Sequence, residues 1–333
     1  MRTTACVVIC LLFACVCPLQ GQQSPVRETV ADVTEGFLSM EDGTRLAYRV
    51  IGTGSETLIV PGGYSSLVTD FSPLGKNRRL VLYDQRGRGH SDPVKDLSHI
   101  GVGYEVRDLE AVRQHFHVEH VSLLGCSYLG GVVALYAFEH VEHVQRLIQV
   151  DPIPPRRELF TQAEQVLTSR LDKAAVNRLE KMRNAGLNKV DPVQFCREAD
   201  RVYNPAYFGD PAAAPKYHTH CELENEQPDN VYKNWNAIDR SLGDWDWRPR
   251  LSLLKSPVLV IYGTKDWIPE SAAQEWVHEL PNARLLELPG VGHISWAERS
   301  DLIFAAADFF LHGSWPEGAT AKWDSNAVTH QER

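Results

Sequence analysis

A strand, a sharp turn and a helix follow one another without a break between Val121 and Ala137, and this stretch constrains the fold most. Its apolar, β-branched start ends at Gly125, and Ser127 stands at the turn before a helical apolar pattern begins. Such a turn lifts a side chain above the carboxyl edge of a sheet, where the next backbone N–H and the helix N-terminus also point. The pattern predicts a nucleophile elbow centred on Ser127.

The rest of the chain is long enough to build a large core around this turn. It has 333 residues, of which 43% are hydrophobic and 23% are charged. We therefore expect one large α/β domain that carries an insertion. The formal net charge of −9 and the lack of a basic cluster argue against a nucleic-acid partner.

The first 21 residues have the pattern of a secretory signal peptide. Arg2 precedes an apolar run, residues 5–17, that is too short to span a bilayer, and polar residues follow it. With cleavage near Gly21, the protein is expected to be secreted or periplasmic and to make no membrane contact. Lipidation at Cys15 is one alternative, and an ordinary buried N-terminal helix is the other.

Four of the seven cysteines lie in this leader, so the mature chain keeps three: Cys126, Cys196 and Cys221. In an oxidising compartment Cys196 and Cys221 can pair, which the sequence alone leaves open. Cys126 is expected to be a small buried packing residue beside the nucleophile. His218 and His220 with Cys221 could bind a metal, but a further ligand at suitable spacing is missing.

Apolar runs alternate with helical patterns on both sides of the elbow. Because the strands are nearly continuous in apolar residues, they predict a mostly parallel central sheet with helices on both faces. The site is then expected beyond the carboxyl ends of the strands. The expected strands are 36–40, 45–50, 57–60, 80–83, 121–124, 144–150, 258–262 and 284–288, and the expected helices are 104–116, 128–140, 271–280 and 297–311.

The alternation stops after Asp151 and returns only at Ser256. Helical stretches, such as residues 158–183, give way there to segments rich in Pro, Asn and aromatic residues. We expect residues 152–250 to form a helical cap that folds over the site. The core would then comprise residues 35–151 and 251–312, followed by a polar, loosely held tail at 313–333.

Two loops after the late strands carry the groups that a serine nucleophile needs. Asp266 lies in G-T-K-D-W and His293 in P-G-V-G-H. A serine hydroxyl is a weak nucleophile until an imidazole takes its proton, and a carboxylate must hold that imidazole in the right tautomer. Ser127, His293 and Asp266 would fill these roles, with Asp151 as the alternative acid. This chemistry needs no cofactor and no metal, and we expect neither.

The loop P-G-G-Y-S-S at residues 61–66 is a candidate for half of an oxyanion hole. Its glycines let backbone N–H groups approach a ligand closely. The backbone N–H of Gly63, or of Tyr64 if the register differs by one, would join that of Tyr128. A plain turn is the alternative.

The order Ser127, Asp266, His293, each on a loop after a strand, resembles the α/β-hydrolase superfamily. The resemblance covers about residues 35–312 and rests on D-Q-R-G-R-G-H-S-D, G-C-S-Y-L-G-G, G-T-K-D and G-V-G-H. Two positions depart from the family pattern. Leu129 stands where the family usually has glycine, so that a shifted register would centre the elbow on Tyr128, and Pro61 replaces a common histidine.

Within the superfamily, W-D-W-R at residues 245–248 and G-H-I-S-W-A-E at residues 292–298 make the sequence look most like the proline iminopeptidase-like hydrolases. In those enzymes, cap carboxylates recognise a free amino terminus. This resemblance implies a serine hydrolase that forms an acyl-enzyme and cleaves an ester or amide bond of a small molecule or short peptide. A carboxylesterase or lactonase and a non-catalytic ligand-binding protein are the alternatives; the oligomeric state is left open. Candidate substrate contacts are Glu222, Glu224, Glu226, Asp229 and Trp267, although the acidic run can also be a solvated loop.

Overall fold

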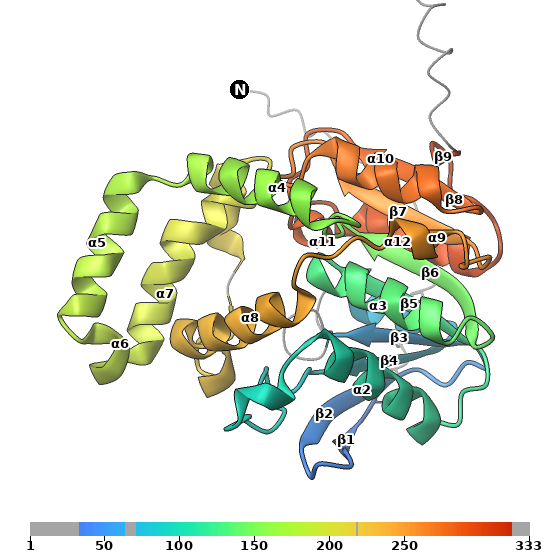
Figure 1. The fold of residues 1–333 in the computed structure, drawn as a ribbon, viewed down its shortest axis with the longest axis horizontal. Helices are drawn as coiled ribbons and strands as arrows, with labels where there is room; N and C mark the ends of the chain where they lie inside the picture. Colours follow the sequence, from blue (N-terminus) through green and yellow to red (C-terminus); the bar gives the residue numbers. More distant parts are fainter. Residues whose placement is uncertain (1–32, 64–70, 218, 322–333) are drawn as a thin grey trace, which may run out of the picture. The chain divides into compact units, whose positions relative to one another are not determined.

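The computed structural model describes residues 33–63, 71–217 and 219–321. The proposed signal peptide with Cys15, the alternative oxyanion residue Tyr64 and the metal candidate His218 lie outside these residues. Within them, one nine-stranded sheet has the order β1-β2-β4-β3-β5-β6-β7-β8-β9 (Figure 1). None of the helices in these three ranges combines the length and apolarity that crossing a membrane would require.

The sheet is parallel from β4 through β3, β5, β6 and β7 to β8, and antiparallel at its edges. All eight expected strands are present. The strands are β1 Val33–Ser39, β2 Arg45–Ile51, β3 Thr57–Pro61, β4 Arg79–Tyr83, β5 Val121–Cys126, β6 Val144–Val150, β7 Val258–Gly263, β8 Ala283–Leu288 and β9 Thr320–Ala321.

Successive residues of the central strands face two separate hydrophobic cores. In β7, for example, Val258 and Val260 join one core, and Leu259 and Ile261 join the other. The first core also takes residues of α2, α3 and α10, and the second takes residues of α12. The core helices are α2 Val102–His115, α3 Tyr128–Glu139, α9 Arg248–Leu251, α10 Glu270–Glu279, α11 Ser295–Glu298 and α12 Ser300–Leu311.

Two expected helices are each divided in the structure. The stretch 158–183 breaks at Leu171 between α4 and α5, and the stretch 297–311 breaks at Arg299 between α11 and α12. The first break is capped by Asp172, whose side chain accepts a hydrogen bond from the backbone N–H of Ala174 at 2.8 Å. A side-chain cap of this kind starts a new helix where the apolar pattern alone shows no interruption.

Between β6 and β7 the chain leaves the sheet and forms a separate group of helices, drawn from green to orange in Figure 1. We call this group the cap. It contains α4 Arg157–Arg170, α5 Lys173–Asn184, α6 Leu187–Val190, α7 Pro192–Tyr203 and α8 Pro228–Leu242, with the short turns η3 Asn204–Ala206, η4 Pro211–Lys216 and η5 Glu224–Glu226.

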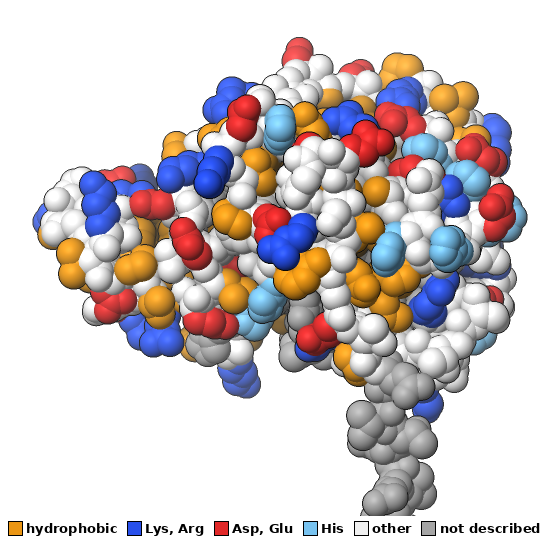
Figure 2. Space-filling model, turned by 90° about the horizontal axis from the view of Figure 1, so that it is seen from below, with side chains coloured by type: hydrophobic (Ala, Val, Ile, Leu, Met, Phe, Trp, Pro, Cys, Tyr) orange, Lys and Arg blue, Asp and Glu red, His pale blue; other side chains and the backbone are white. Residues whose placement is uncertain are grey.

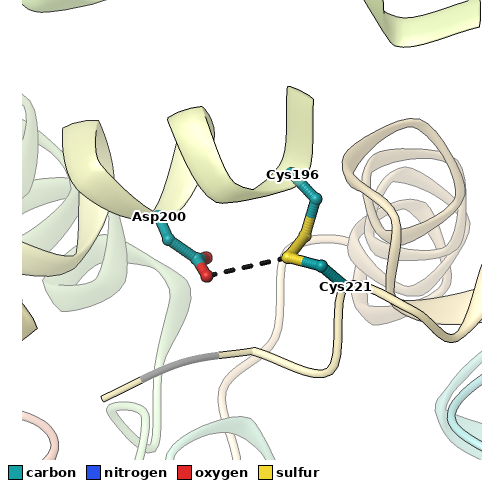
Figure 3. A group of neighbouring side chains, drawn as sticks. All are labelled: Cys196, Asp200 and Cys221. Atoms are coloured by element: carbon teal, nitrogen blue, oxygen red, sulfur yellow. Dashed lines mark hydrogen bonds between the residues drawn. A yellow bond between two sulfur atoms is a disulfide. The ribbon is translucent and has the colours of Figure 1, made fainter. Parts of the chain in front are cut away.

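A disulfide between Cys196 on α7 and Cys221 fixes the segment that leads into η5 (Figure 3). The carboxylate of Asp200 lies beside Cys221, 3.8 Å from its Sγ. Because the two sulfurs are bonded to each other, neither can act as a thiolate ligand, so the metal site suggested for Cys221 is not supported. The remaining cysteine, Cys126, is buried and lies outside the disulfide, as expected.

We predicted a loosely held tail from Gly313 onward, and this prediction is wrong for the residues up to Ala321. Trp315 lies 5.0 Å from the ring of Phe310, and the guanidinium of Arg284 lies 4.9 Å from the Trp315 ring. The chain then forms β9, which pairs with β8.

On the face shown in Figure 2, acidic and basic side chains are interspersed.

Candidate active site

Ser127 occupies a strained turn between β5 and α3. Its φ of 53° and ψ of −126° lie outside the regions that L-residues normally adopt. Its N–H donates to the carbonyl of Val150 at 2.9 Å, and its own carbonyl accepts from the N–H groups of Gly130 and Ile153 at 3.0 and 3.1 Å. Such a conformation costs about 1–3 kcal/mol and persists only where the surroundings fix it.

Gly125 allows β5 and α3 to approach closely at this turn. A Cβ at Gly125 would lie 2.2 Å from the carbonyl oxygen of Leu129. The side chain of Leu129 points instead at Gly62, where a Cβ would lie 2.5 Å from Leu129 Cδ1. A glycine at position 129 is therefore not required for the elbow to form.

The structure brings Ser127, His293 and Asp266 together in one buried chain of hydrogen bonds. The Nε2 of His293 lies 2.8 Å from Ser127 Oγ, and its Nδ1 lies 2.9 Å from Asp266 Oδ2. An ionised carboxylate can only accept, so Nδ1 carries the hydrogen and the lone pair of Nε2 faces the serine hydroxyl. This arrangement can move a proton from Ser127 to His293.

The shifted register of the elbow is wrong. Tyr128 is the first residue of α3, and its hydroxyl is buried without a hydrogen-bond partner. Burial, followed by the negative charge of Glu105, raises the pKa of Tyr128 well above its usual value. Ser127, whose positive φ marks the turn and whose Oγ contacts His293, is therefore the residue at its centre.

The alternative acid, Asp151, contacts other groups than His293. Its Oδ1 accepts a hydrogen bond from the backbone N–H of Gly263 at 2.8 Å, and its Oδ2 accepts one from the hydroxyl of Ser295. Burial, followed by the charge of Asp266, raises the pKa of Asp151 well above its usual value. Asp151 thus joins the loops that carry Asp266 and His293, and Asp266 is the carboxylate that holds the imidazole.

The two predicted oxyanion donors, Gly63 and Tyr128, lie just after the end of β3 and at the start of α3. A Cβ at Gly63 would lie 2.6 Å from a methyl group of Leu82, so packing requires glycine there. Tyr128 begins α3, and the first N–H groups of a helix have no partner within the helix. Both positions are therefore suited to supply backbone donors.

Aromatic side chains from the cap and from the Asp266 loop surround the imidazole. The ring of Trp267 lies 5.1 Å from that of His293, and the ring of Tyr207 lies 5.8 Å from it. Phe160 and Trp235 continue this wall, at 6.1 Å from each other. Trp267, a predicted substrate contact, thus lies beside the imidazole. Tyr207, Phe160 and Trp235 belong to the cap, and the sequence analysis did not single out these three residues.

The cap also contacts the backbone of the two loops that carry Asp266 and His293. The N–H of His293 donates to the carbonyl of Tyr207 at 2.7 Å, and Arg170 donates to the carbonyl of Asp266 at 2.7 Å. Glu298 accepts from the N–H groups of Gly292 and Gly209 at 2.8 and 3.1 Å. The positions of the acid and the base are thus partly set by the cap.

The cap carboxylates do not contact the triad. Glu222 and Glu224 are exposed, and Glu222 pairs with His220 at 3.0 Å beside a cap cavity of about 670 Å³. Asp229 pairs with Arg183. The predicted role of Glu222 and Glu224 in substrate binding is therefore not supported by their positions.

Glu226 is the buried member of this group, and it holds the cap on the core. It makes two hydrogen bonds with Arg88, at 3.0 and 2.7 Å, and accepts another from the backbone N–H of Gly89 at 2.7 Å. The neighbouring Asn225 donates to the carbonyls of Gly89 and Ser91. The charge of Glu226 is thus already paired within the protein.

Comparison with known proteins agrees with this architecture. A family model described as the alpha/beta hydrolase fold matches residues 58–299, more than two thirds of the chain. A proline iminopeptidase of Pestalotiopsis fici, PfmaB, is 26% identical over 274 residues, which cover 79% of this chain and 94% of the relative. A (lyso)-N-acylphosphatidylethanolamine lipase of Bos taurus is 28% identical over 262 residues, covering 74% of this chain and 75% of the lipase.

Among solved structures, the proline iminopeptidase of Mycobacterium smegmatis superposes with a TM-score of 0.61 at 24% identity, over 84% of this chain and 98% of that chain. At this identity the likeness establishes the fold only. Together with the sheet order and the family model, it shows that the chain belongs to the α/β-hydrolase fold family.

Proposed function

We propose that the protein is a serine hydrolase that cleaves an ester or amide bond through an acyl-enzyme intermediate. The observation that carries this proposal is the 2.8 Å contact between Ser127 Oγ and His293 Nε2, with Asp266 bonded to the other ring nitrogen. A triad with these contacts and a strained nucleophile serves no evident structural purpose, which weighs against a non-catalytic ligand-binding protein.

In the proposed reaction, Ser127 Oγ attacks the substrate carbonyl carbon while its proton moves to His293 Nε2. The carbonyl oxygen becomes an oxyanion, which accepts hydrogen bonds from the backbone N–H groups of Gly63 and Tyr128. When the intermediate collapses, the leaving group departs with the proton from His293. Water, deprotonated by His293, then attacks the acyl ester, and Ser127 is restored with release of the acid.

The first substrate class that we propose is that of the proline iminopeptidases, which recur among the relatives. The aromatic wall of Tyr207, Phe160 and Trp235 would suit the apolar ring of an amino-terminal residue. A free amino terminus would need an acidic partner, and the structure leaves few candidates, because Glu226 and Asp229 are already paired with arginines.

That pairing favours a second candidate, a carboxylesterase or lactonase acting on small acyl substrates. Such a substrate carries no ammonium group, so it needs only the triad, the oxyanion hole and an apolar pocket. The aromatic residues around His293 supply apolar surface for such a substrate without further charges.

Labelling with a fluorophosphonate probe tests the hydrolase proposal. The wild type should be labelled, Ser127→Ala should not, and Ser169→Ala, which changes an exposed serine on α4, should be labelled as the wild type is. Absence of labelling in the wild type, or equal labelling of Ser127→Ala, would refute it.

A substrate panel then separates the two classes. Proline arylamides and other aminoacyl arylamides would be compared with short and long acyl esters and with lactones. The iminopeptidase proposal requires kcat/KM to be highest for the proline arylamide, and its loss when the amino group is blocked. Preference for the esters or lactones would support the second candidate instead.

We further propose that the protein is secreted or periplasmic after cleavage near Gly21. The Cys196–Cys221 disulfide supports this proposal, because disulfides persist mainly in oxidising compartments. N-terminal sequencing of the mature protein, together with a mass that distinguishes an acylated Cys15, would test it.

A further inference from the structure

Glu105, on the first turn of α2, is a buried carboxyl group that the proposed reaction does not use. Its side chain is only 1% exposed. Its Oε1 accepts a hydrogen bond from Gln85 Nε2 at 2.8 Å, whereas its Oε2 is buried without a hydrogen-bond partner in the described part of the chain. Buried carboxyl groups are normally fully bonded, so this one calls for an explanation.

Gln85 connects Glu105 to the oxyanion loop. A Cβ at Gly62 would lie 3.2 Å from Gln85 Oε1 on one side and 2.5 Å from Leu129 Cδ1 on another. Gly62 also has a φ of +66°, which few other residues adopt. It is therefore held between Gln85 and Leu129, and it directly precedes Gly63, the proposed oxyanion donor.

Glu105 also lies near the second proposed donor. The hydroxyls of Tyr83 and Tyr128 are both buried, and both lack a hydrogen-bond partner. After burial itself, the negative charge of Glu105 is the largest influence that raises the pKa of each tyrosine. Tyr128 also carries the backbone N–H at the start of α3, so an ionised Glu105 would act on the residue that supplies the second proposed donor.

We propose that Glu105 is a positioning residue for the oxyanion hole, an inference that rests on the serine hydrolase proposed above. Through its hydrogen bond with Gln85 it holds the side chain that borders Gly62, which directly precedes Gly63. It contacts neither the substrate nor the reacting atoms. A buried negative charge at this place would oppose the oxyanion, so Glu105 has to be uncharged for the fastest reaction.

The surroundings of Glu105 keep it protonated at neutral pH. Burial raises its pKa to about 8; the hydrogen bond from Gln85 lowers the pKa in part, and the charge of Asp108 on the same helix raises it further. Arg86 and Arg88 act in the opposite direction, but Arg86 is bonded to Asp108 and Arg88 to Glu226, so both cations are already neutralised. The remaining neighbours, Tyr83 and Tyr128, stay uncharged.

The pH profile of the wild type and of Glu105→Gln tests the proposal. The rates of fluorophosphonate labelling and of acyl ester hydrolysis would be measured from pH 6 to 10. In the wild type both rates should fall with a midpoint near pH 8, the pKa of Glu105. At pH 9.5 they should be at least about tenfold below their maximum. Glu105→Gln can still accept from Gln85 but cannot ionise, so it should lose this fall and keep its neutral-pH rate.

Gln85→Leu tests the connection to Gly62. It should lower kcat by about 10- to 100-fold with little change in KM, because only the transition state uses the oxyanion hole. The matched control is Asp108→Asn, which changes another buried carboxyl of α2 one turn away, bonded to Arg86 instead of Gln85. It should lower the melting temperature but keep the alkaline fall in rate.

The outcomes separate this proposal from the proposed function. Absence of labelling and turnover at every pH would refute the hydrolase itself. An active wild type whose rates do not fall near pH 8, or a Glu105→Gln variant that keeps the fall with the same midpoint, would refute the role of Glu105 alone. If Glu105→Gln does not fold, the wild-type profile and the kcat and KM of Gln85→Leu still decide the question.

Discussion

The ends of β6 and β7 carry two buried aspartates at the same edge of the sheet, but the two make different contacts. Asp151 follows β6 directly, with a positive φ of 46°, and its carboxyl group bonds Gly263 and Ser295. Asp266 comes three residues after the end of β7, and the longer loop lets it reach His293. The number of residues between the strand end and the aspartate therefore decides which carboxylate reaches His293.

The two carboxyl groups also differ in their electrostatic surroundings. Asp266 accepts a hydrogen bond from the imidazole Nδ1–H. The pKa of Asp151 is raised well above its usual value by burial and by the charge of Asp266, which favours its neutral form. One carboxyl group orients His293, and the other ties the Asp266 loop to the His293 loop.

The largest effect should come from Asp266→Asn. The amide can donate to Nδ1 and so stabilise the wrong tautomer, which should lower kcat by about 10⁴-fold at neutral pH. Steady-state hydrolysis of the best ester or amide substrate measures it, with circular dichroism to verify folding. A loss of tenfold or less would mean that Asp151 can replace Asp266, and the comparison above would fail.

A smaller effect is expected for Asp151→Ala. Removing the carboxyl group leaves the buried N–H of Gly263 without an acceptor, which should cost about 1–3 kcal/mol in the free energy of unfolding. Because the acid loop is then less well held, kcat should fall about 10- to 100-fold. Asp151→Asn should retain most of the activity and stability, since an amide replaces a neutral carboxyl group. Equal losses in both variants would show that Asp151 is ionised.

The pH dependence of stability tests the raised pKa of Asp151. The folded protein keeps the proton of Asp151 to a higher pH than the unfolded chain, which releases it above about pH 4. Stability from this group is thus complete below that pH and declines as the pH rises towards the folded pKa. As the pH rises from 4 to 7, the stability of Asp151→Asn relative to the wild type should therefore increase, as measured by urea unfolding. A constant difference would indicate that the pKa of Asp151 is not raised.

The smallest effect is expected for Ser295→Ala. It removes only the hydroxyl that donates to Asp151 Oδ2, so the free energy of unfolding should fall by about 1 kcal/mol. The backbone bond from Gly263 remains, and kcat should change less than about threefold. Thermal unfolding and steady-state kinetics measure both quantities. If Ser295→Ala lost as much stability as Asp151→Ala, the bond from Ser295, and not the bond from Gly263, would make the main contribution of Asp151 to stability.

The sequence predicted well the features that depend on neighbouring residues. The strands follow from short apolar runs, and the strand-turn-helix around Ser127 follows from one glycine and one polar residue in such a run. The order of Ser127, Asp266 and His293 was sufficient to predict that these residues meet, because the parallel strands bring their carboxyl ends to one edge.

The contacts of the cap could not be predicted, because they join residues far apart in the chain. In the sequence, Glu226 is a candidate substrate contact, but in the structure it is bonded to Arg88, which lies 138 positions away. Glu105 was missed although the sequence contains a signal for it. It lies on the same helical face as Leu109 and Val112, so that the apolar stripe of α2 includes a carboxyl group at a core position.

The hydrogen bond from the N–H of His293 to the carbonyl of Tyr207 has a consequence for exchanging caps between relatives. A transplanted cap that fills the pocket well would still fail if it offered no carbonyl at this point, since the base loop would lose a support made by backbone alone. Side-chain comparison cannot find this requirement. Chimeras should therefore be joined so that residues 206–209 and 290–293 come from the same parent.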